Sequence, residues 1–152
     1  ENYIGGERRS GWINDGSAWY YLDPTTGIMQ TGWKQIGNKW YYLRSSGAMT
    51  TGWYQEGSTW YYLDAENGDM KTGWQYLGNK WYYLRSSGAM VTGWVKDGST
   101  WYYLNASNGD MKTGWTKVNG NWYYLNSSGA MVTGSQTIDG KVYNFASSGE
   151  WI

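Results

Sequence analysis

A pair of tryptophan motifs recurs along the chain at a nearly constant spacing, and this period constrains the fold more than any other feature. Gly-Trp occurs six times, and its Trp residues are Trp12, Trp33, Trp53, Trp74, Trp94 and Trp115. Seven residues after each of them a second Trp begins Trp-Tyr-Tyr-Leu, at Trp19, Trp40, Trp60, Trp81, Trp101 and Trp122. A Gly-x-Met tripeptide closes the units, at Met29, Met49, Met70, Met90, Met111 and Met131. Such a period indicates a repeat protein, because each unit buries its apolar face only by stacking on its neighbours.

The connectors inside the units alternate in length, so that units of 21 and 20 residues form pairs with a period of 41. Odd units carry five-residue connectors such as 64–68, and even units carry four-residue connectors such as 85–88. A degenerate seventh unit follows, with Ser135 for the first Trp and Trp151 for the Met. We therefore expect residues 11–133 to be six full repeats and residues 134–152 a C-terminal capping repeat. Residues 1–10 are expected to be an N-terminal cap or the remnant of an upstream segment.

Each unit predicts a β-hairpin, because two aromatic-rich segments flank a Gly-containing turn. If Trp12 pairs with Trp19, the turn is Asp15-Gly16, a favoured two-residue loop. The same register places Glu56-Gly57 in the loop of the third unit. A single hairpin is marginally stable in water, so the units must stack. The predicted fold class is therefore all-β, a solenoid of stacked β-hairpins.

Strand alternation separates the residues of each Trp-Tyr-Tyr-Leu string onto two faces. Trp19 and Tyr21 share one face, and Tyr20 and Leu22 share the other. We expect the Tyr/Leu face to form the core, since the Trp face carries more aromatic surface than a core alone requires. With 13 Trp and 16 Tyr, the chain also depends on aromatic rings for its apolar area.

Two indoles and a phenol on neighbouring hairpins suit a bound cation. Aromatic faces attract cations, and a quaternary ammonium needs no hydrogen-bond acceptor. A Met thioether is a polarizable wall for such a cage. Only two of the six Met residues follow an acid, Asp69 and Asp110, which favours trimethylammonium over lysine-like cations. Two alternatives stay open, a carbohydrate (glucan-type) binding array and a structural spacer or adhesion stalk whose rings are mainly core.

Several functional classes are disfavoured by composition. Without Cys or His the chain has no thiol nucleophile, disulfide, thiolate zinc site or imidazole base, and we expect no metal and no cofactor. A net charge of zero argues against nucleic acid, and no apolar run is long enough for membrane insertion. Carboxylates such as Asp23 and Asp64 lie in connectors, so we expect no enzyme in this chain, although a parent protein could carry a separate catalytic domain.

The repeated string T-G-W-x(3)-G-x(2)-W-Y-Y-L-x(3)-G-x-M resembles the choline-binding repeats of streptococcal and phage cell-wall proteins, over residues 11–152. The resemblance implies a left-handed superhelix of hairpins with choline held between consecutive hairpins. It implies a non-catalytic attachment module that binds phosphocholine on teichoic acids, outside the cell, at the bacterial surface or cell wall. It also implies a possible homodimer through the C-terminal repeats.

In that family a cage takes two Trp from one hairpin and a Tyr from the next, often closed by a Met. We assign the second Tyr of each pair, because it shares a face with the Trp. The five implied cages are Trp12, Trp19 and Tyr42; Trp33, Trp40 and Tyr62; Trp53, Trp60 and Tyr83; Trp74, Trp81 and Tyr103; and Trp94, Trp101 and Tyr124. The sequence leaves open which of Met29, Met49, Met70, Met90, Met111 and Met131 closes which cage. A sixth cage would use Trp115 and Trp122, but Asn144 stands at the Tyr position, and Trp151 is the candidate to fill the gap.

Overall fold

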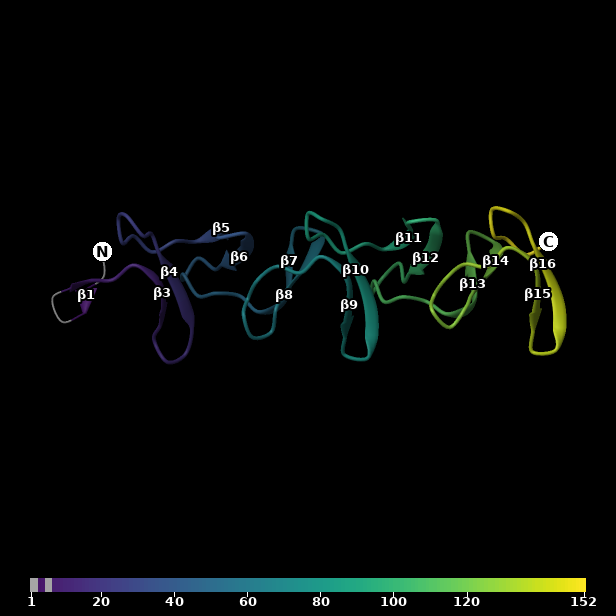
Figure 1. Ribbon diagram of the computed structural model, residues 1–152, viewed down its shortest axis with the longest axis horizontal. Coiled ribbons are helices and arrows are strands. Elements are labelled where there is room, and N and C mark those ends of the chain that lie inside the picture. Colours follow the sequence, from purple (N-terminus) through teal and green to yellow (C-terminus); the bar gives the residue numbers. More distant parts are fainter. Residues whose placement is uncertain (1–2, 5–6) are drawn as a thin grey trace. The chain divides into compact units, whose positions relative to one another are not determined.

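The computed structural model describes residues 3–4 and 7–152, and over these residues the chain is all-β (Figure 1). Its strands pair in sequence order as antiparallel hairpins. The pairs are β1 (Tyr3–Ile4) with β2 (Glu7–Arg8), β3 (Gly11–Asn14) with β4 (Trp19–Leu22), β5 (Gly32–Ile36) with β6 (Lys39–Leu43), β7 (Gly52–Glu56) with β8 (Thr59–Leu63), β9 (Gly73–Leu77) with β10 (Lys80–Leu84), β11 (Gly93–Asp97) with β12 (Thr100–Leu104), β13 (Gly114–Val118) with β14 (Asn121–Leu125), and β15 (Gly134–Ile138) with β16 (Lys141–Phe145). The predicted array of hairpins is confirmed, one hairpin for each of the seven units.

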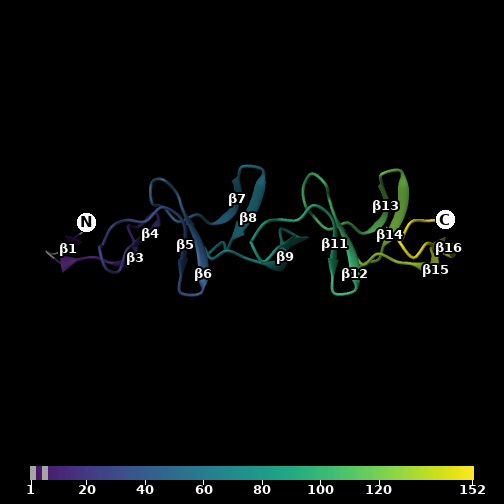
Figure 2. The same cartoon turned by 90° about the horizontal axis from the view of Figure 1, so that it is seen from above.

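The contacts of the chain divide it into two compact units. The first comprises residues 1–72 and 86–89, and the second residues 73–85 and 90–152. Hairpins β3–β4, β5–β6 and β7–β8 belong to the first compact unit, and those from β9–β10 onward belong to the second. Figure 2 shows the hairpins from above. Residues 1–2 and 5–6, within the predicted cap or remnant, lie outside the described residues, and that prediction stays open. No helix in the described part of the chain is long and apolar enough to span a membrane.

The strand register differs from our prediction by two residues. The first Trp of each hairpin pairs with the second Tyr, as in Trp53↔Tyr62, and not with the second Trp. This register makes Gly57 the first loop residue, with φ of +63°, as the type II′ turns of two-residue hairpins require. Because side chains alternate with a period of two, the shift leaves every residue on its predicted face. The first hairpin departs from this pattern, since its pairing stops at Asn14↔Trp19.

The longer loop of the first hairpin is organised by Asp15. The backbone N–H groups of Ser17 and Ala18 donate to its Oδ1, each at 2.9 Å, and lower the pKa of Asp15 from 3.8 to about 2. Ionised Asp15 therefore stabilises the folded state above about pH 4, and this contribution is lost as the pH falls through about 2.

Asp15→Ala should lower the melting temperature at neutral pH and have little effect at about pH 2. Thermal unfolding of both proteins over this range tests this, and a difference that does not shrink in acid would contradict it.

Leucine side chains at the ends of the second strands form the core. They are fully buried, with 0% exposure, at Leu22, Leu43, Leu63, Leu84, Leu104 and Leu125. Each of them also makes a β-bridge with the Met of its own unit, as in Leu43↔Met49. In the seventh unit Phe145 takes the place of the Leu and bridges to Trp151. The prediction that the Leu-bearing face forms the core is confirmed.

Within each of the two compact units, successive hairpins are joined through the Gly-x-Met segment. The backbone N–H of Met49 donates to the carbonyl of Trp19 in the preceding hairpin at 2.8 Å, and Met111 does the same to Trp81 at 2.8 Å. The glycine of the segment accommodates the Met of the preceding unit. At Gly47, where φ is +90°, an added Cβ would lie 2.4 Å from Sδ of Met29. The segment therefore links neighbouring hairpins by both a hydrogen bond and close packing.

Candidate functional site

Aromatic cages lie between consecutive hairpins within each of the two compact units. We number each cage by the hairpin that supplies its two Trp. The second cage is a pocket whose apolar walls are Trp33 and Trp40 of one hairpin and Tyr61 and Met70 of the next. The rings of Trp33 and Tyr61 meet edge to face, with centroids 5.0 Å apart and an interplanar angle of 63°. This geometry leaves aromatic faces open to a ligand.

The same arrangement recurs along the chain. The first cage has Trp12, Trp19, Tyr41 and Met49, and the fourth has Trp74, Trp81, Tyr102 and Met111. In the fifth, Trp94 lies 6.4 Å from Trp101 and 4.9 Å from Tyr123, measured between ring centroids. In the third, Trp53 and Trp60 are 6.3 Å apart. Tyr83, the predicted partner of Trp53 and Trp60, belongs to the other compact unit. The third cage therefore stays a prediction.

Our choice of tyrosine was wrong. In the first, second, fourth and sixth cages the residue at the first Tyr position lines the pocket, whereas the second Tyr packs against the first Trp of its own hairpin. Tyr41 lies 4.9 Å from Trp12, whereas Tyr42 lies 5.1 Å from Trp33. The other second tyrosines behave alike, in the pairs Trp53–Tyr62, Trp74–Tyr83, Trp94–Tyr103 and Trp115–Tyr124.

The reason lies in how neighbouring hairpins meet. Alternation along one strand determines which residues share a face, but not which face the next hairpin turns toward the tryptophans. The next hairpin presents its Tyr/Leu face, so the first Tyr meets the preceding Trp while the Leu beside it is buried. The first Tyr therefore has a cage role as well as its predicted place on the core face. The Met that closes a cage, left open by the sequence, comes from the same following hairpin.

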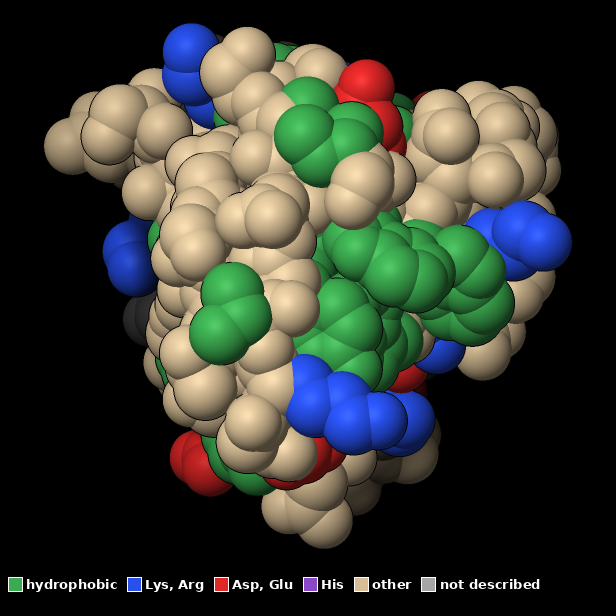
Figure 3. Space-filling model, turned by 90° about the vertical axis from the view of Figure 1, so that its right-hand side faces the viewer, with side chains coloured by type: hydrophobic (Ala, Val, Ile, Leu, Met, Phe, Trp, Pro, Cys, Tyr) green, Lys and Arg blue, Asp and Glu red, His purple; other side chains and the backbone are tan. Residues whose placement is uncertain are grey.

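The sixth cage is complete and differs in one wall. It is lined by Trp115, Trp122, Tyr143 and Trp151, so that an indole replaces the Met. Tyr143 lies 4.9 Å from Trp115, and Trp151 lies 5.8 Å from both of these rings. Because the cage uses the first Tyr position, Asn144 at the second position removes no wall. Figure 3 faces the end where the C-terminal hairpin lies, and apolar side chains gather there in one patch.

The second Trp of each hairpin is unusually open for an aromatic residue. Trp40 is 39% exposed and Trp19 is 42% exposed, with similar values along the repeat. Cations already lie over two of these rings. Nζ of Lys96 is 5.9 Å from the centroid of the Trp101 ring, and Nζ of Lys117 is 5.9 Å from that of Trp122. The exposed indoles are thus suited to a cationic ligand.

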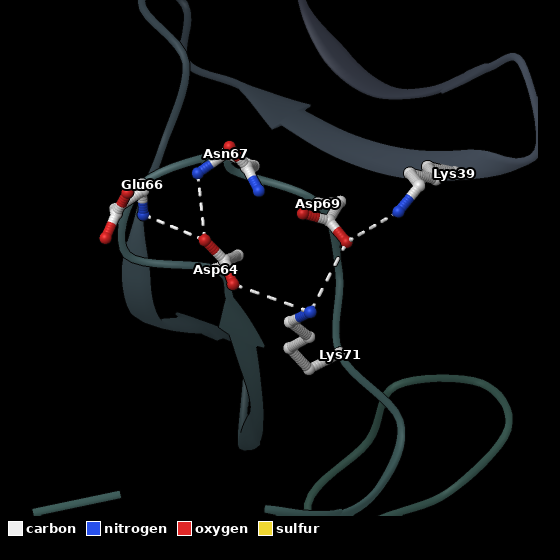
Figure 4. A network of polar contacts seen from close by, with 6 residues as sticks. All are labelled: Lys39, Asp64, Glu66, Asn67, Asp69 and Lys71. Atoms are coloured by element: carbon white, nitrogen blue, oxygen red, sulfur yellow. Dashed lines mark hydrogen bonds and ion pairs between the residues drawn. The ribbon is translucent and has the colours of Figure 1, made fainter.

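The rim of the first cage contains a network of charged groups (Figure 4). Nζ of Lys39 lies 3.4 Å from Oδ2 of Asp69, which also lies 3.6 Å from Nζ of Lys71. Lys71 in turn lies 3.4 Å from Asp64, whose pKa is lowered mainly by hydrogen bonds from the backbone of Asn67 and Glu66. Asp69 is only 5% exposed. Lys39 and Lys71 therefore pair with Asp64 and Asp69 at this rim.

Four-residue connectors give a different rim. Ser86 and Ser87 line the second cage, and Ser127 and Ser128 line the fourth. Connector length thus changes the chemistry of the rim between the first cage and the second and fourth, a difference we did not predict although the 41-residue period was its signal. In the described residues no group of three or more acidic side chains could hold a metal ion.

Stacked hairpins with an aromatic pocket between neighbours define a repeat-type binding module. Residues 30–72, 71–113 and 112–152 match the model of the choline-binding repeat, and residues 10–29 match that of a cell wall binding repeat. The chain belongs to the choline-binding repeat family, which confirms the resemblance inferred from its repeated string.

Solved structures agree with this assignment. CbpJ from Streptococcus pneumoniae TIGR4 is 76% identical, with a TM-score of 0.93, over 99% of this chain and 51% of that one. Choline binding protein F from Streptococcus pneumoniae, solved with a peptidoglycan analogue, is 62% identical, with a TM-score of 0.90, over 97% and 48%. A pneumococcal cell wall endolysin from phage Cp-1, complexed with choline, is 36% identical, with a TM-score of 0.58, over 87% and 39%. The chain spans about half the length of the first two. No curated protein matches its sequence.

Proposed function

We propose that the chain is an attachment module whose aromatic cages hold the choline of phosphocholine-bearing teichoic acids in a bacterial cell wall, outside the cell. The observation that carries the proposal is the shared pocket of two indoles, a phenol and a thioether, with Trp33, Trp40, Tyr61 and Met70 as its type. A quaternary ammonium is weakly hydrated, carries no N–H group and is attracted by each aromatic face. Family membership supports the same ligand.

Repetition is what makes such a module useful. A ligand as small as choline offers few contacts, so each cage binds it weakly. A wall polymer presents many choline groups to several cages on one chain, and this multivalency raises avidity by about 10²–10⁴-fold over a single site.

The module itself carries no chemistry in this proposal. The side chains of the connector acids Asp64 and Asp69 are engaged in hydrogen bonds and ion pairs. The proposal therefore gives them no role as a catalytic acid and base. A parent protein can carry catalysis in another domain. The homodimer predicted through the C-terminal repeats stays a prediction, and Val142 and Ile152 are exposed apolar residues there.

A choline titration followed by calorimetry and tryptophan fluorescence tests the proposal. We expect saturable binding of several choline molecules per chain, with no comparable response to glucose or ammonium chloride. Choline should also raise the melting temperature, since a ligand at 100 times its Kd adds about 2.7 kcal/mol per site to the free energy of unfolding. An equal response to glucose would favour the carbohydrate-binding alternative, and no response to either would favour the spacer.

A further inference from the structure

In two cages the first indole donates a hydrogen bond to a carboxylate of the following hairpin. Nε1 of Trp33 in the second cage donates to Oε1 of Glu56 at 3.3 Å. Nε1 of Trp74 in the fourth cage donates to Oδ2 of Asp97 at 2.9 Å. Both acids end the first strand of the following hairpin, directly before its loop glycine. They are therefore the same position of the 41-residue repeat.

The equivalent position is aliphatic at the other described cages. Ile36 occupies it beside the first cage, Val118 beside the fifth and Ile138 beside the sixth. These side chains accept no hydrogen bond and carry no charge. The cages thus fall into two classes, with and without an acid bound to the first indole.

Glu56 is held in place from two sides. Its other oxygen, Oε2, accepts a hydrogen bond from the Tyr54 hydroxyl at 3.3 Å, and its side chain lines the second cage. The Tyr54 ring in turn stacks on Tyr42, with centroids 4.1 Å apart. Interaction with the Tyr42 hydroxyl, burial and the Glu56 charge together raise the pKa of Tyr54, so its hydroxyl stays protonated and can donate to Glu56 well above neutral pH. The carboxylate is therefore a positioned group and not a freely moving surface charge.

An acid in this place changes what a cage recognises. Its hydrogen bond orients the indole, and its negative charge lies close to a cation held on that ring. In cages with Ile or Val at this position, dispersion and the ring quadrupoles hold the trimethylammonium group, and the quadrupole attraction already favours a positive charge. We infer that Glu56 and Asp97 are specificity residues that make the second and fourth cages select more strongly for the positive charge of the ligand than the aromatic rings alone do. This inference rests on the proposed function, because it assumes that the cages bind choline.

The test compares choline with dimethylbutanol, the uncharged isostere in which carbon replaces nitrogen. Binding is followed at each cage by NMR of isotope-labelled indole N–H groups in the full chain, with the Trp33 signal assigned from Trp33→Phe. The preference for choline over the isostere should be about two- to fivefold greater at the second cage than at the first, the size expected for an exposed charge. High salt should reduce this difference.

Two variants of Glu56 separate charge from hydrogen bonding, and two further variants serve as a gain-of-function test and a control. Glu56→Gln keeps an acceptor for Trp33, so we expect the preference to fall to that of the first cage while the Trp33 signal stays near its place. Glu56→Ala removes both, so the ligand-free Trp33 signal should move as its hydrogen bond is lost. Ile36→Glu adds an acid beside the first cage and should raise the preference there. Asp97→Asn is the matched control, which should change the response of Trp74 and leave that of Trp33 unaltered.

The outcomes distinguish this inference from the function on which it rests. If no indole responds to choline, the proposed function fails and the inference fails with it. If choline still binds but Glu56→Gln leaves the preference at Trp33 unchanged, only the inference is overturned. A ligand-free Trp33 signal that does not move in Glu56→Ala would also overturn it, because the acid would then not contact the indole.

Discussion

Replacing Trp40 by alanine is expected to abolish choline binding at the second cage and to lower the number of choline molecules bound per chain by one. The indole forms a complete wall of that pocket and is 39% exposed, so its removal opens the cage to solvent. The hydrogen bond from Met70 to the Trp40 carbonyl, at 2.7 Å, involves only backbone atoms and survives the substitution. Calorimetric stoichiometry measures the loss, and an unchanged stoichiometry would contradict the cage assignment.

A matched pair of tyrosine variants then tests which ring completes this cage. Tyr61→Ala removes a wall of the second cage, whereas Tyr62→Ala removes a ring that packs on Trp53 in its own hairpin. We expect the indole signals of Trp33 and Trp40 to lose their choline response in the first variant and to keep it in the second. The reverse result would restore the second Tyr as the cage residue.

The largest loss of stability is expected from Leu104→Ala. This side chain is 0% exposed and lies where the second strand ends and bridges to Met111. Truncation of a fully buried leucine leaves a cavity, and such changes cost about 2–5 kcal/mol in the free energy of unfolding. Among the described residues each of the six full repeats has one fully buried leucine, so few other core side chains are available to fill the space. Denaturant unfolding measures the cost.

Val142→Ala is the control for this measurement. Val142 is also apolar and lies in a hairpin of the same unit, but it is 66% exposed. Its truncation should change the free energy of unfolding by less than about 0.5 kcal/mol. Equal effects of the two substitutions would show that the leucine row is not the core.

Much of the fold was predictable because its information is local. The period of the Trp motifs defines the units, and alternation along Trp60-Tyr61-Tyr62-Leu63 defines the two faces of a strand. The register error at Trp53 was two residues, and a shift of two leaves every side chain on the same face. The burial of Leu63 and the exposure of Trp60 therefore followed from the sequence despite the wrong partner.

By itself the sequence determined the repeat, the hairpins, the leucine core and the presence of two Trp on one face of each of the six full repeats, because these depend on spacing within about 20 residues. Only the tertiary structure decided that Tyr41 and not Tyr42 faces Trp12, and that Glu56 contacts Trp33. These contacts join residues of different hairpins, and they depend on how one hairpin is rotated against the next. Alternation within a strand carries no record of that rotation, which the packing of Met on Gly and the hydrogen bonds between hairpins set.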